Sequence, residues 1–290
     1  MGSFARRFLV FIAVGAVLYF VAVKAYYYFS VPKTRNCCYV WGESTMCQDI
    51  DLDYLNKNMH YNFFSAAKHG AGVYDFLVFT QVVPENSKVF IGIGKTSIVR
   101  RKDKDYNRSG IDYESLYLLH ENGYSLKELF SIFLNNHAPH QMFDNLNTLY
   151  PNTDSLQFGN EPLSLFQNIF GNRPNYLDNK ENLFLYGIQT LIRKHCKIIA
   201  IDFPRHPILD AIIQQSAYLG KLDSFMNDVD VFFPKQEILD LDLDRTDFHD
   251  LTHLNEKGAE KLTQELVPFL DFKDTPTMIS VQENNRANPK

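Results

Sequence analysis

The sequence predicts an α/β protein, in which helices cover both faces of a parallel sheet to give three layers, preceded by one transmembrane helix. Short apolar runs that suit buried strands occur at residues 37–41, 60–65, 88–94 and 196–202 and alternate with stretches of helical periodicity. Residues 8–23 form an apolar segment near the N-terminus. The alternation of strands and helices indicates right-handed crossovers between parallel strands.

The length, charge and cysteine content of the chain limit which kinds of protein it can be. The chain has 290 residues, of which 45% are hydrophobic, enough for one α/β domain and a membrane anchor. Its formal net charge of -5 provides no general basic surface, so nucleic acid is not an expected partner. Cys37, Cys38, Cys47 and Cys196 lack the spacing of a metal site and are expected to be small buried residues, with any disulfide left open.

Residues 1–35 are expected to form a membrane anchor. Arg6 and Arg7 precede the apolar segment, Lys24 follows it, and the aromatic residues at 26–29 suit a membrane interface. A cleavable signal peptide is the alternative, but no small-x-small cleavage site follows the apolar segment. The two arginines favour a cytoplasmic N-terminus, which predicts a single-pass inner-membrane protein with its globular part on the periplasmic or extracellular side.

The candidate catalytic residues come from opposite ends of the chain. Ser44 follows the first expected strand, after Gly42 and Glu43, where open α/β sheets bind ligands. Asp250 stands three residues before His253, ahead of a helical pattern. A carboxylate so placed can orient the histidine and leave its Nε2 atom free to act as a base. The alternative is that Asp250 caps the following helix while His253 lies on the surface.

Together these segments resemble the SGNH (GDSL-type) hydrolases, in the membrane-anchored envelope branch that includes the D-alanine transfer protein of teichoic acid synthesis and the alginate acetylation proteins. The resemblance covers residues 36–270 and is strongest in Val-Trp-Gly-Glu-Ser at 40–44 and Asp-Leu-Thr-His-Leu-Asn at 250–255. It implies a flavodoxin-like SGNH fold with a Ser-His-Asp triad.

In that family the serine is the nucleophile and the late Asp-x-x-His motif supplies the orienting acid and the base. The resemblance therefore implies that Ser44 attacks the substrate, His253 is the base and Asp250 orients it. It also implies an oxyanion hole formed by the backbone N–H groups of Ser44 and Gly70, with Gly72 as the alternative to Gly70.

The chain departs from the family at its third conserved segment. Where the family has Gly-x-Asn-Asp, residues 92–97 read Gly-Ile-Gly-Lys-Thr-Ser. The oxyanion asparagine is replaced by Gly94 or Thr96, depending on which glycine is aligned, and Thr96, Lys95 or a backbone N–H is the candidate substitute. Loss of one such donor typically lowers the rate by about 100- to 1,000-fold.

Two further regions are expected near the site. Residues 100–182 form a long insertion rich in Asn, Phe and Pro, which we interpret as a cap. Arg205 and His206 follow the strand at 196–202 and are candidates for substrate contact, although a proline-flanked turn is sufficient to explain them.

The expected domain limits follow from these segments. The SGNH-like domain occupies residues 36–270, with its last strand at 229–233. Residues 271–290 are polar and are expected to form a flexible tail.

The implied function is a serine esterase or O-acyltransferase that acts on acyl groups, most simply acetyl, of an exported glycan, lipid-linked sugar or envelope polymer without a metal or cofactor. A membrane-bound O-acyltransferase is a further implied partner. One alternative is a non-catalytic SGNH-like module that binds glycan or such an acyltransferase, which the absent asparagine favours. Another is a metal-dependent hydrolase that uses His249, His253 and Asp250, although no remote ligand pair accompanies them.

Overall fold

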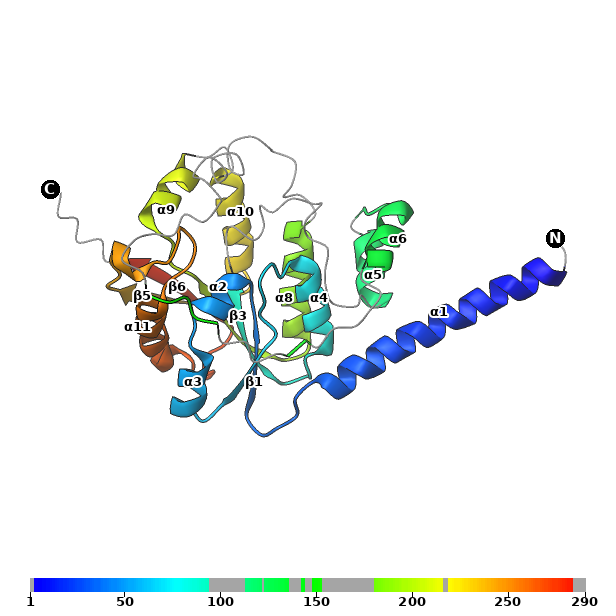
Figure 1. The fold of residues 1–290 in the computed structure, drawn as a ribbon, viewed down its shortest axis with the longest axis horizontal. Coiled ribbons are helices and arrows are strands. Elements are labelled where there is room, and N and C mark those ends of the chain that lie inside the picture. The colour runs from blue at the N-terminus through cyan, green and yellow to red at the C-terminus, as the bar shows by residue number, and fades with distance from the viewer. Residues whose placement is uncertain are drawn as a thin grey trace.

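The chain folds around a single parallel sheet. The computed structural model describes residues 3–93, 113–121, 123–135, 142–143, 148–152, 180–215 and 219–283. Six strands lie in the order β2-β1-β3-β4-β6-β5, and every neighbouring pair is parallel. The protein is therefore an α/β protein, and its first helix projects away from the sheet (Figure 1).

The elements follow one another in regular alternation. The strands are β1 (Cys37–Trp41), β2 (Asn62–Ser65), β3 (Lys88–Ile93), β4 (Lys197–Asp202), β5 (Lys235–Leu241) and β6 (Thr277–Glu283). The helices are α1 (Ser3–Ser30), α2 (Ser44–Gln48), α3 (Leu52–Asn58), α4 (Val73–Val82), α5 (Tyr113–Glu121), α6 (Leu126–Asn135), α8 (Lys180–Arg193), α9 (Pro207–Gln214), α10 (Leu219–Asp230) and α11 (Glu256–Leu266). Two short 3₁₀ turns, η1 (Arg245–Asp247) and η2 (Val267–Phe269), flank α11.

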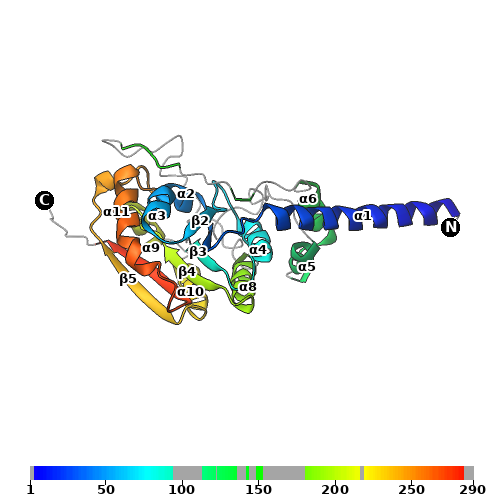
Figure 2. The same ribbon diagram turned by 90° about the horizontal axis from the view of Figure 1, so that it is seen from below.

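Helices cover both faces of the sheet. Alternate residues of a strand point to opposite faces, so Tyr39 and Trp41 of β1 join one core, while Cys38 and Val40 join the other. Helices α4, α8 and α10 lie on one face of the sheet and α2, α3 and α11 on the other (Figure 2). Side chains of the first three helices pack in the first core, and those of the other three in the second. The three layers account for the almost uninterrupted apolar character of β1, β3 and β4, because a strand covered on both faces has no solvent-exposed side.

The C-terminal part of α1 packs onto the globular domain. Val23, Tyr27 and Val31 are buried in the same core as Tyr39, and the Tyr39 hydroxyl donates to the carbonyl of Pro32 at 2.6 Å. The preceding part of the helix exposes its apolar side chains. By length and composition α1 can cross a membrane.

Two helices within the expected insertion form a hairpin beside α1. Ser125 and Glu128 begin α6 with reciprocal bonds, since the Ser125 N–H donates to Glu128 Oε2 at 2.9 Å and the Glu128 N–H donates to Ser125 Oγ at 3.3 Å. One face of the hairpin packs on α4 and α8 through a buried cluster of Tyr74, Leu77, Leu119, Tyr124, Ile132 and Leu183. Phe133 contacts α1, with its ring centroid 5.3 Å from Tyr19 and 6.1 Å from Phe20.

The C-terminal strand corrects two expectations. Residues 229–233 were expected to form the last strand, but α10 extends to Asp230 and the next strand is β5. The flexible tail expected at 271–290 is wrong for residues 277–283, which form β6 between β4 and β5. Met278 and Ile279 on β6 are buried on opposite faces of the sheet, and their burial outweighs the polar character of the flanking residues. Residues 284–290 lie outside the described residues.

Candidate active site

Ser44 lies at the carboxyl end of a central strand. β1 ends at Trp41, and α2 begins at Ser44 after the two residues Gly42 and Glu43. A methyl group on Gly42 would overlap the Cβ atom of Met46, a fully buried residue of α2, so the turn closes tightly only with glycine. β1 is a central strand, between β2 and β3. Ser44 therefore lies at the carboxyl ends of the parallel strands, where α/β folds bind ligands.

His253 joins Ser44 to Asp250 in a continuous hydrogen-bonded chain. The Nε2 atom of His253 lies 2.8 Å from Ser44 Oγ, across 209 positions of sequence. The Nδ1 atom of the same ring lies 2.8 Å from Asp250 Oδ2 and 3.0 Å from Asp250 Oδ1. With Asp250 ionised, Nδ1 carries the proton and Nε2 accepts the serine hydroxyl. The three residues expected from the sequence are thus brought together.

The local turn stabilises the Asp250 carboxylate. Its Oδ1 atom accepts the N–H groups of Thr252 and His253 at 2.7 and 2.8 Å, and the Thr252 hydroxyl at 2.9 Å. Burial alone would raise the pKa of Asp250, but the hydrogen bond and charge of His253 and the two bonds from Thr252 outweigh it and lower the pKa to about 2. Asp250 therefore stays ionised at neutral pH. Thr252 was not singled out from the sequence.

The alternative that Asp250 caps the next helix is wrong. Asn255 is the N-terminal cap of α11, because its Oδ1 atom accepts the Gly258 N–H at 3.1 Å. The side chain of His253 is only 13% exposed, so it is not a surface residue. The Asp250 carboxylate instead binds the His253 ring.

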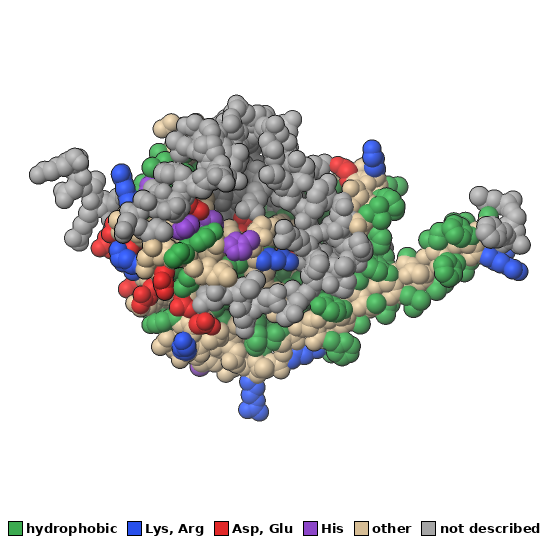
Figure 3. Space-filling view, viewed as in Figure 1, with side chains coloured by type: hydrophobic (Ala, Val, Ile, Leu, Met, Phe, Trp, Pro, Cys, Tyr) green, Lys and Arg blue, Asp and Glu red, His purple; other side chains and the backbone are tan. Residues whose placement is uncertain are grey.

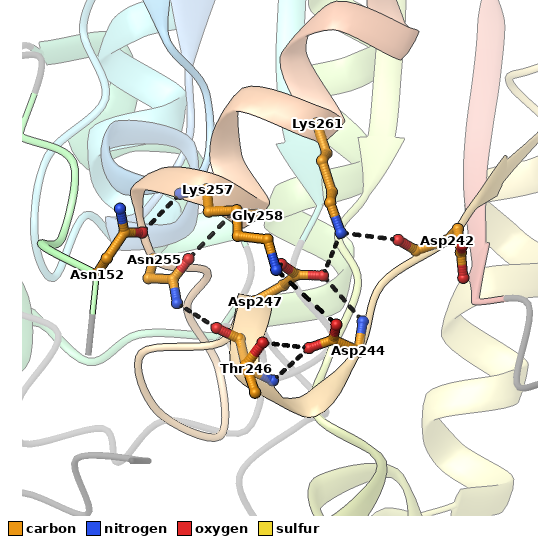
Figure 4. Close-up of polar contacts among 9 residues, drawn as sticks. All are labelled: Asn152, Asp242, Asp244, Thr246, Asp247, Asn255, Lys257, Gly258 and Lys261. Atoms are coloured by element: carbon orange, nitrogen blue, oxygen red, sulfur yellow. Dashed lines mark hydrogen bonds and ion pairs between the residues drawn. The ribbon is translucent and has the colours of Figure 1, made fainter. Parts of the chain in front are cut away.

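An ionic cluster centred on one buried carboxylate closes the loop that carries Asp250 and His253, which we call the His253 loop (residues 248–254). Asp247 is fully buried at its base, where its carboxylate binds Lys257 at 2.8 Å and Lys261 at 2.6 Å. Asn255 joins the two sides of the base, since its side-chain amide donates to the Thr246 carbonyl at 2.6 Å and its N–H donates to the Asp247 carbonyl at 3.0 Å. Figure 4 shows these contacts between η1 and the first turns of α11. The cluster fixes where the loop begins and ends.

Asp49 connects the segment that carries Ser44 to the His253 loop. This residue follows α2 and is fully buried, and its Oδ1 atom accepts the Leu254 N–H at 3.0 Å. Burial is the main cause that raises the pKa of Asp49 well above its ordinary range, and the nearby charge of Asp250 raises it further. The protonated form of Asp49 is therefore favoured more strongly than in an exposed aspartate. Nothing local in the sequence distinguishes it.

One described segment of the expected cap, residues 148–152, lies against His253. Tyr150 stacks on His249 with ring centroids 3.9 Å apart and meets His253 edge-on at 5.4 Å. Backbone bonds fix this segment, because the Thr148 N–H donates to the Cys47 carbonyl at 3.4 Å and the Tyr150 carbonyl accepts the Glu256 N–H at 2.7 Å. Residues 94–112, 136–141, 144–147 and 153–179 lie outside the described residues. The insertion thus contributes at least Tyr150 to the site.

The expected oxyanion donors are only partly described. The segment that contains Gly70 runs beside the turn before Ser44, since the Lys68 N–H donates to the Gly42 carbonyl at 3.3 Å. Gly70 itself has a φ angle of 72°, which glycine adopts readily. The alternative, Gly72, is the residue that caps α4. Gly94 and Thr96 lie outside the described residues.

Arg205 and His206 have structural partners. Arg205 binds Asp202 and Asp210 at 2.9 Å each, and His206 is fully buried, with its Nδ1 atom accepting the Ile208 N–H at 3.3 Å. Burial opposes the charge of Arg205, but the two carboxylates raise its pKa above the ordinary value. Substrate contact by either residue stays a prediction, and this geometry does not favour it.

Other side chains of the site bear on its chemistry. Burial, together with the nearby charge of His253, lowers the pKa of His69, and burial likewise lowers the pKa of His249. Among the described residues, no three His, Cys, Asp or Glu side chains are arranged to hold a metal ion. All four cysteines are unpaired. The site thus combines an oriented histidine with a serine hydroxyl, an arrangement that can activate the hydroxyl as a nucleophile.

No protein-family model matches this sequence, and no curated protein is significantly similar to it.

Proposed function

We propose that this chain is a membrane-anchored serine hydrolase or acyltransferase of the SGNH type, acting on acyl esters through Ser44, His253 and Asp250. The single observation that supports it most is the hydrogen-bonded chain from Ser44 Oγ through the His253 ring to Asp250, with both links at 2.8 Å. The same hydrogen-bonded geometry of serine, histidine and aspartate recurs in enzymes of nucleophilic acyl transfer on unrelated folds. The ionised state of Asp250 supports the tautomer that the reaction needs.

The reaction proceeds in two halves. Ser44 Oγ attacks the carbonyl carbon of the ester while His253 Nε2 takes its proton, and backbone N–H groups, those of Ser44 and Gly70 in this proposal, stabilise the oxyanion. Collapse of the tetrahedral intermediate expels the alcohol, which receives the proton from Nε2, and leaves an acyl-serine. Water or a sugar hydroxyl then attacks the acyl group and gives its proton to Nε2. The product leaves with the acyl group, and Ser44 regains its proton.

The family resemblance and the anchor together suggest the class of substrate. We assign α1 to the inner membrane, with the sheet on the periplasmic or extracellular side, because Arg6 and Arg7 precede the apolar segment. The burial of Val23 and Tyr27 in the domain core supports an uncleaved anchor, since cleavage after them would remove core side chains. The substrate is then an acylated glycan, lipid-linked sugar or envelope polymer close to that membrane.

A fluorophosphonate probe tests the nucleophile directly. The full chain, purified in detergent, should form a covalent adduct at Ser44, and Ser44→Ala should abolish the adduct without lowering the melting temperature, because a partly exposed serine contributes little packing. Thr45→Ala is the matched control and should label like the unmutated chain. Labelling that persists in Ser44→Ala would reject the mechanism.

The second candidate is a non-catalytic SGNH-like module that binds glycan or a membrane-bound acyltransferase. The absence of the asparagine at residues 92–97 favours it. The same probe separates the two functions, because a folded chain that does not react, and does not hydrolyse aryl acetates, would support the binding module.

A further inference from the structure

The hairpin of α5 and α6 leaves an apolar stripe uncovered. Leu126, Phe130 and Leu134 recur every four residues on α6, so they lie on one face of the helix, and they are 76%, 62% and 52% exposed. Tyr117 on α5 is also exposed. The opposite face of α6 is buried on α4 and α8 through Ile132, so the stripe is not needed for the domain core. An exposed apolar patch of this kind marks a contact with something outside the domain.

The position of the stripe indicates what that contact is. α6 touches α1 directly, with Phe133 against Tyr19 and Phe20. Both views of the fold place α5 and α6 beside α1, on the side of the sheet from which the helix projects (Figures 1 and 2). In the space-filling view, apolar side chains line both α1 and the adjoining flank of the hairpin (Figure 3). The stripe therefore continues the apolar surface of α1.

We infer that α6 is a second membrane contact, an interfacial helix whose stripe of Leu126, Phe130 and Leu134 enters the outer leaflet of the bilayer that α1 crosses. This inference rests on the proposed anchoring by α1. The position of the α6 contact along α1 is consistent with an interfacial helix. Phe20 precedes Lys24 by four residues, about 6 Å of helix at 1.5 Å per residue. Interfacial helices bury their apolar face by roughly 5–10 Å at the boundary between headgroups and acyl chains, so Phe133, which contacts Phe20, lies at the expected level if Lys24 marks the interface.

The polar residues of α6 fit the same orientation. Lys127 lies next to the stripe at the start of the helix, whereas Glu128 lies on the opposite side, where the Ser125 hydroxyl holds it at 2.8 Å. A lysine beside an apolar stripe can extend its ammonium group to the headgroups while its methylene groups remain in contact with lipid. The helix thus has the amphipathic character of an element that lies in the membrane plane.

Tryptophan fluorescence tests the inference in the full chain. The chain has one tryptophan, Trp41, which is buried, so a new tryptophan reports its own surroundings against a constant background. Phe130→Trp should emit at shorter wavelength in nanodiscs than an exposed tryptophan and should lose fluorescence when the lipid acyl chains carry bromine. Ile238→Trp, on the exposed edge strand β5 away from α1, is the negative control, and Val17→Trp, exposed on α1, is the positive control.

The outcomes distinguish the anchor from the hairpin. Bromine quenching of Phe130→Trp and Val17→Trp but not of Ile238→Trp supports the inference. Quenching of Val17→Trp alone would leave the anchor in place and reject the interfacial role of α6. A blue-shifted but unquenched Phe130→Trp would mean that a protein surface covers the stripe and would also reject it. Absence of quenching at Val17→Trp would reject the anchoring on which both rest.

Discussion

Tyr150 stacks face to face on His249, with their ring planes 2° apart and their centroids 3.9 Å apart. The pair forms one wall beside His253, because the Tyr150 ring also meets His253 edge-on. Tyr150 belongs to the insertion, whereas both histidines belong to the His253 loop. The insertion thus contacts the proposed catalytic base, and the effect of this contact can be tested by mutation.

Tyr150→Ala should lower kcat/KM for aryl acetates by about two- to tenfold, since an aromatic pair contributes about 0.5–1.5 kcal/mol beyond its area. Tyr150→Phe is the control and should remain close to the unmutated chain, because it keeps both ring contacts. If both substitutions were equally harmful, the hydroxyl rather than the ring would be the important group.

Asp250→Asn should lower kcat by about 10³- to 10⁴-fold, because an amide holds the histidine in the wrong tautomer and does not stabilise the imidazolium. The variant should also change stability with pH. The lowered pKa of Asp250, about 2, means that the carboxylate stabilises the fold above its ordinary pKa and loses that contribution as pH falls through about 2. The difference in free energy of unfolding between the two proteins should therefore shrink below pH 4, roughly the ordinary pKa of Asp. A pH-independent difference would contradict this explanation.

Asp49→Asn should gain stability relative to the unmutated chain as pH rises. The raised pKa means that Asp49 holds its proton to higher pH in the folded protein than in the unfolded chain, which releases it above about pH 4. Between the two pKa values the folded state binds more protons than the unfolded state, so the free energy of unfolding of the unmutated chain falls with rising pH, and asparagine removes that dependence. Thermal unfolding at pH 5 and pH 8 measures it.

Asp53→Asn, an exposed change of the same kind on α3, is the control for Asp49→Asn. It shows the effect of the amide substitution at a position that is not buried. Asp49→Ala should lose activity as well as stability, because the buried Leu254 N–H would then lack its acceptor.

Gly258→Ala should destabilise the protein and displace the His253 loop. An added methyl group would overlap the carbonyl oxygen of Asp247 and press on its side chain, and overpacking of this kind typically costs about 1–3 kcal/mol. Gly220→Ala is the matched control, since nothing lies within 4 Å of its added methyl group. That substitution should stabilise the protein by up to about 1 kcal/mol through helix propensity. Melting temperature and fluorophosphonate labelling of both variants measure the two effects.

Local sequence patterns were sufficient to predict the front of the fold. The strand expected at residues 37–41 is β1, and the one expected at 88–94 is β3, because buried parallel strands are short, apolar and β-branched. The position of Ser44 was predictable for the same reason, because this residue comes shortly after β1. The Asp-x-x-His spacing places Asp250 under His253 within one turn of chain, so their contact was predictable without knowing the fold.

Contacts between distant segments were not predictable in this way. β6 has polar neighbours, and its position between β4 and β5 depends on pairing with strands far away in sequence. Asp49 becomes important only through Leu254, 205 positions later, and Tyr150 only through the His253 loop. A proline after Tyr150 indicated a turn but not what the turn would meet.

The burial of Val23 and Tyr27 in the domain core limits how far Ser44 can move relative to α1. Only six residues separate α1 from β1, and the end of α1 is already packed, so the domain has no tether on which to swivel. For an anchored chain, Ser44 would stay at one fixed height above the membrane surface while the protein diffuses laterally. Lateral diffusion would bring it many substrates, but only acyl groups at that height would be attacked. If the proposed function holds, lengthening the connection at residues 31–36 and replacing the buried Val23 and Tyr27 by polar residues should together change which positions along a growing polymer are modified.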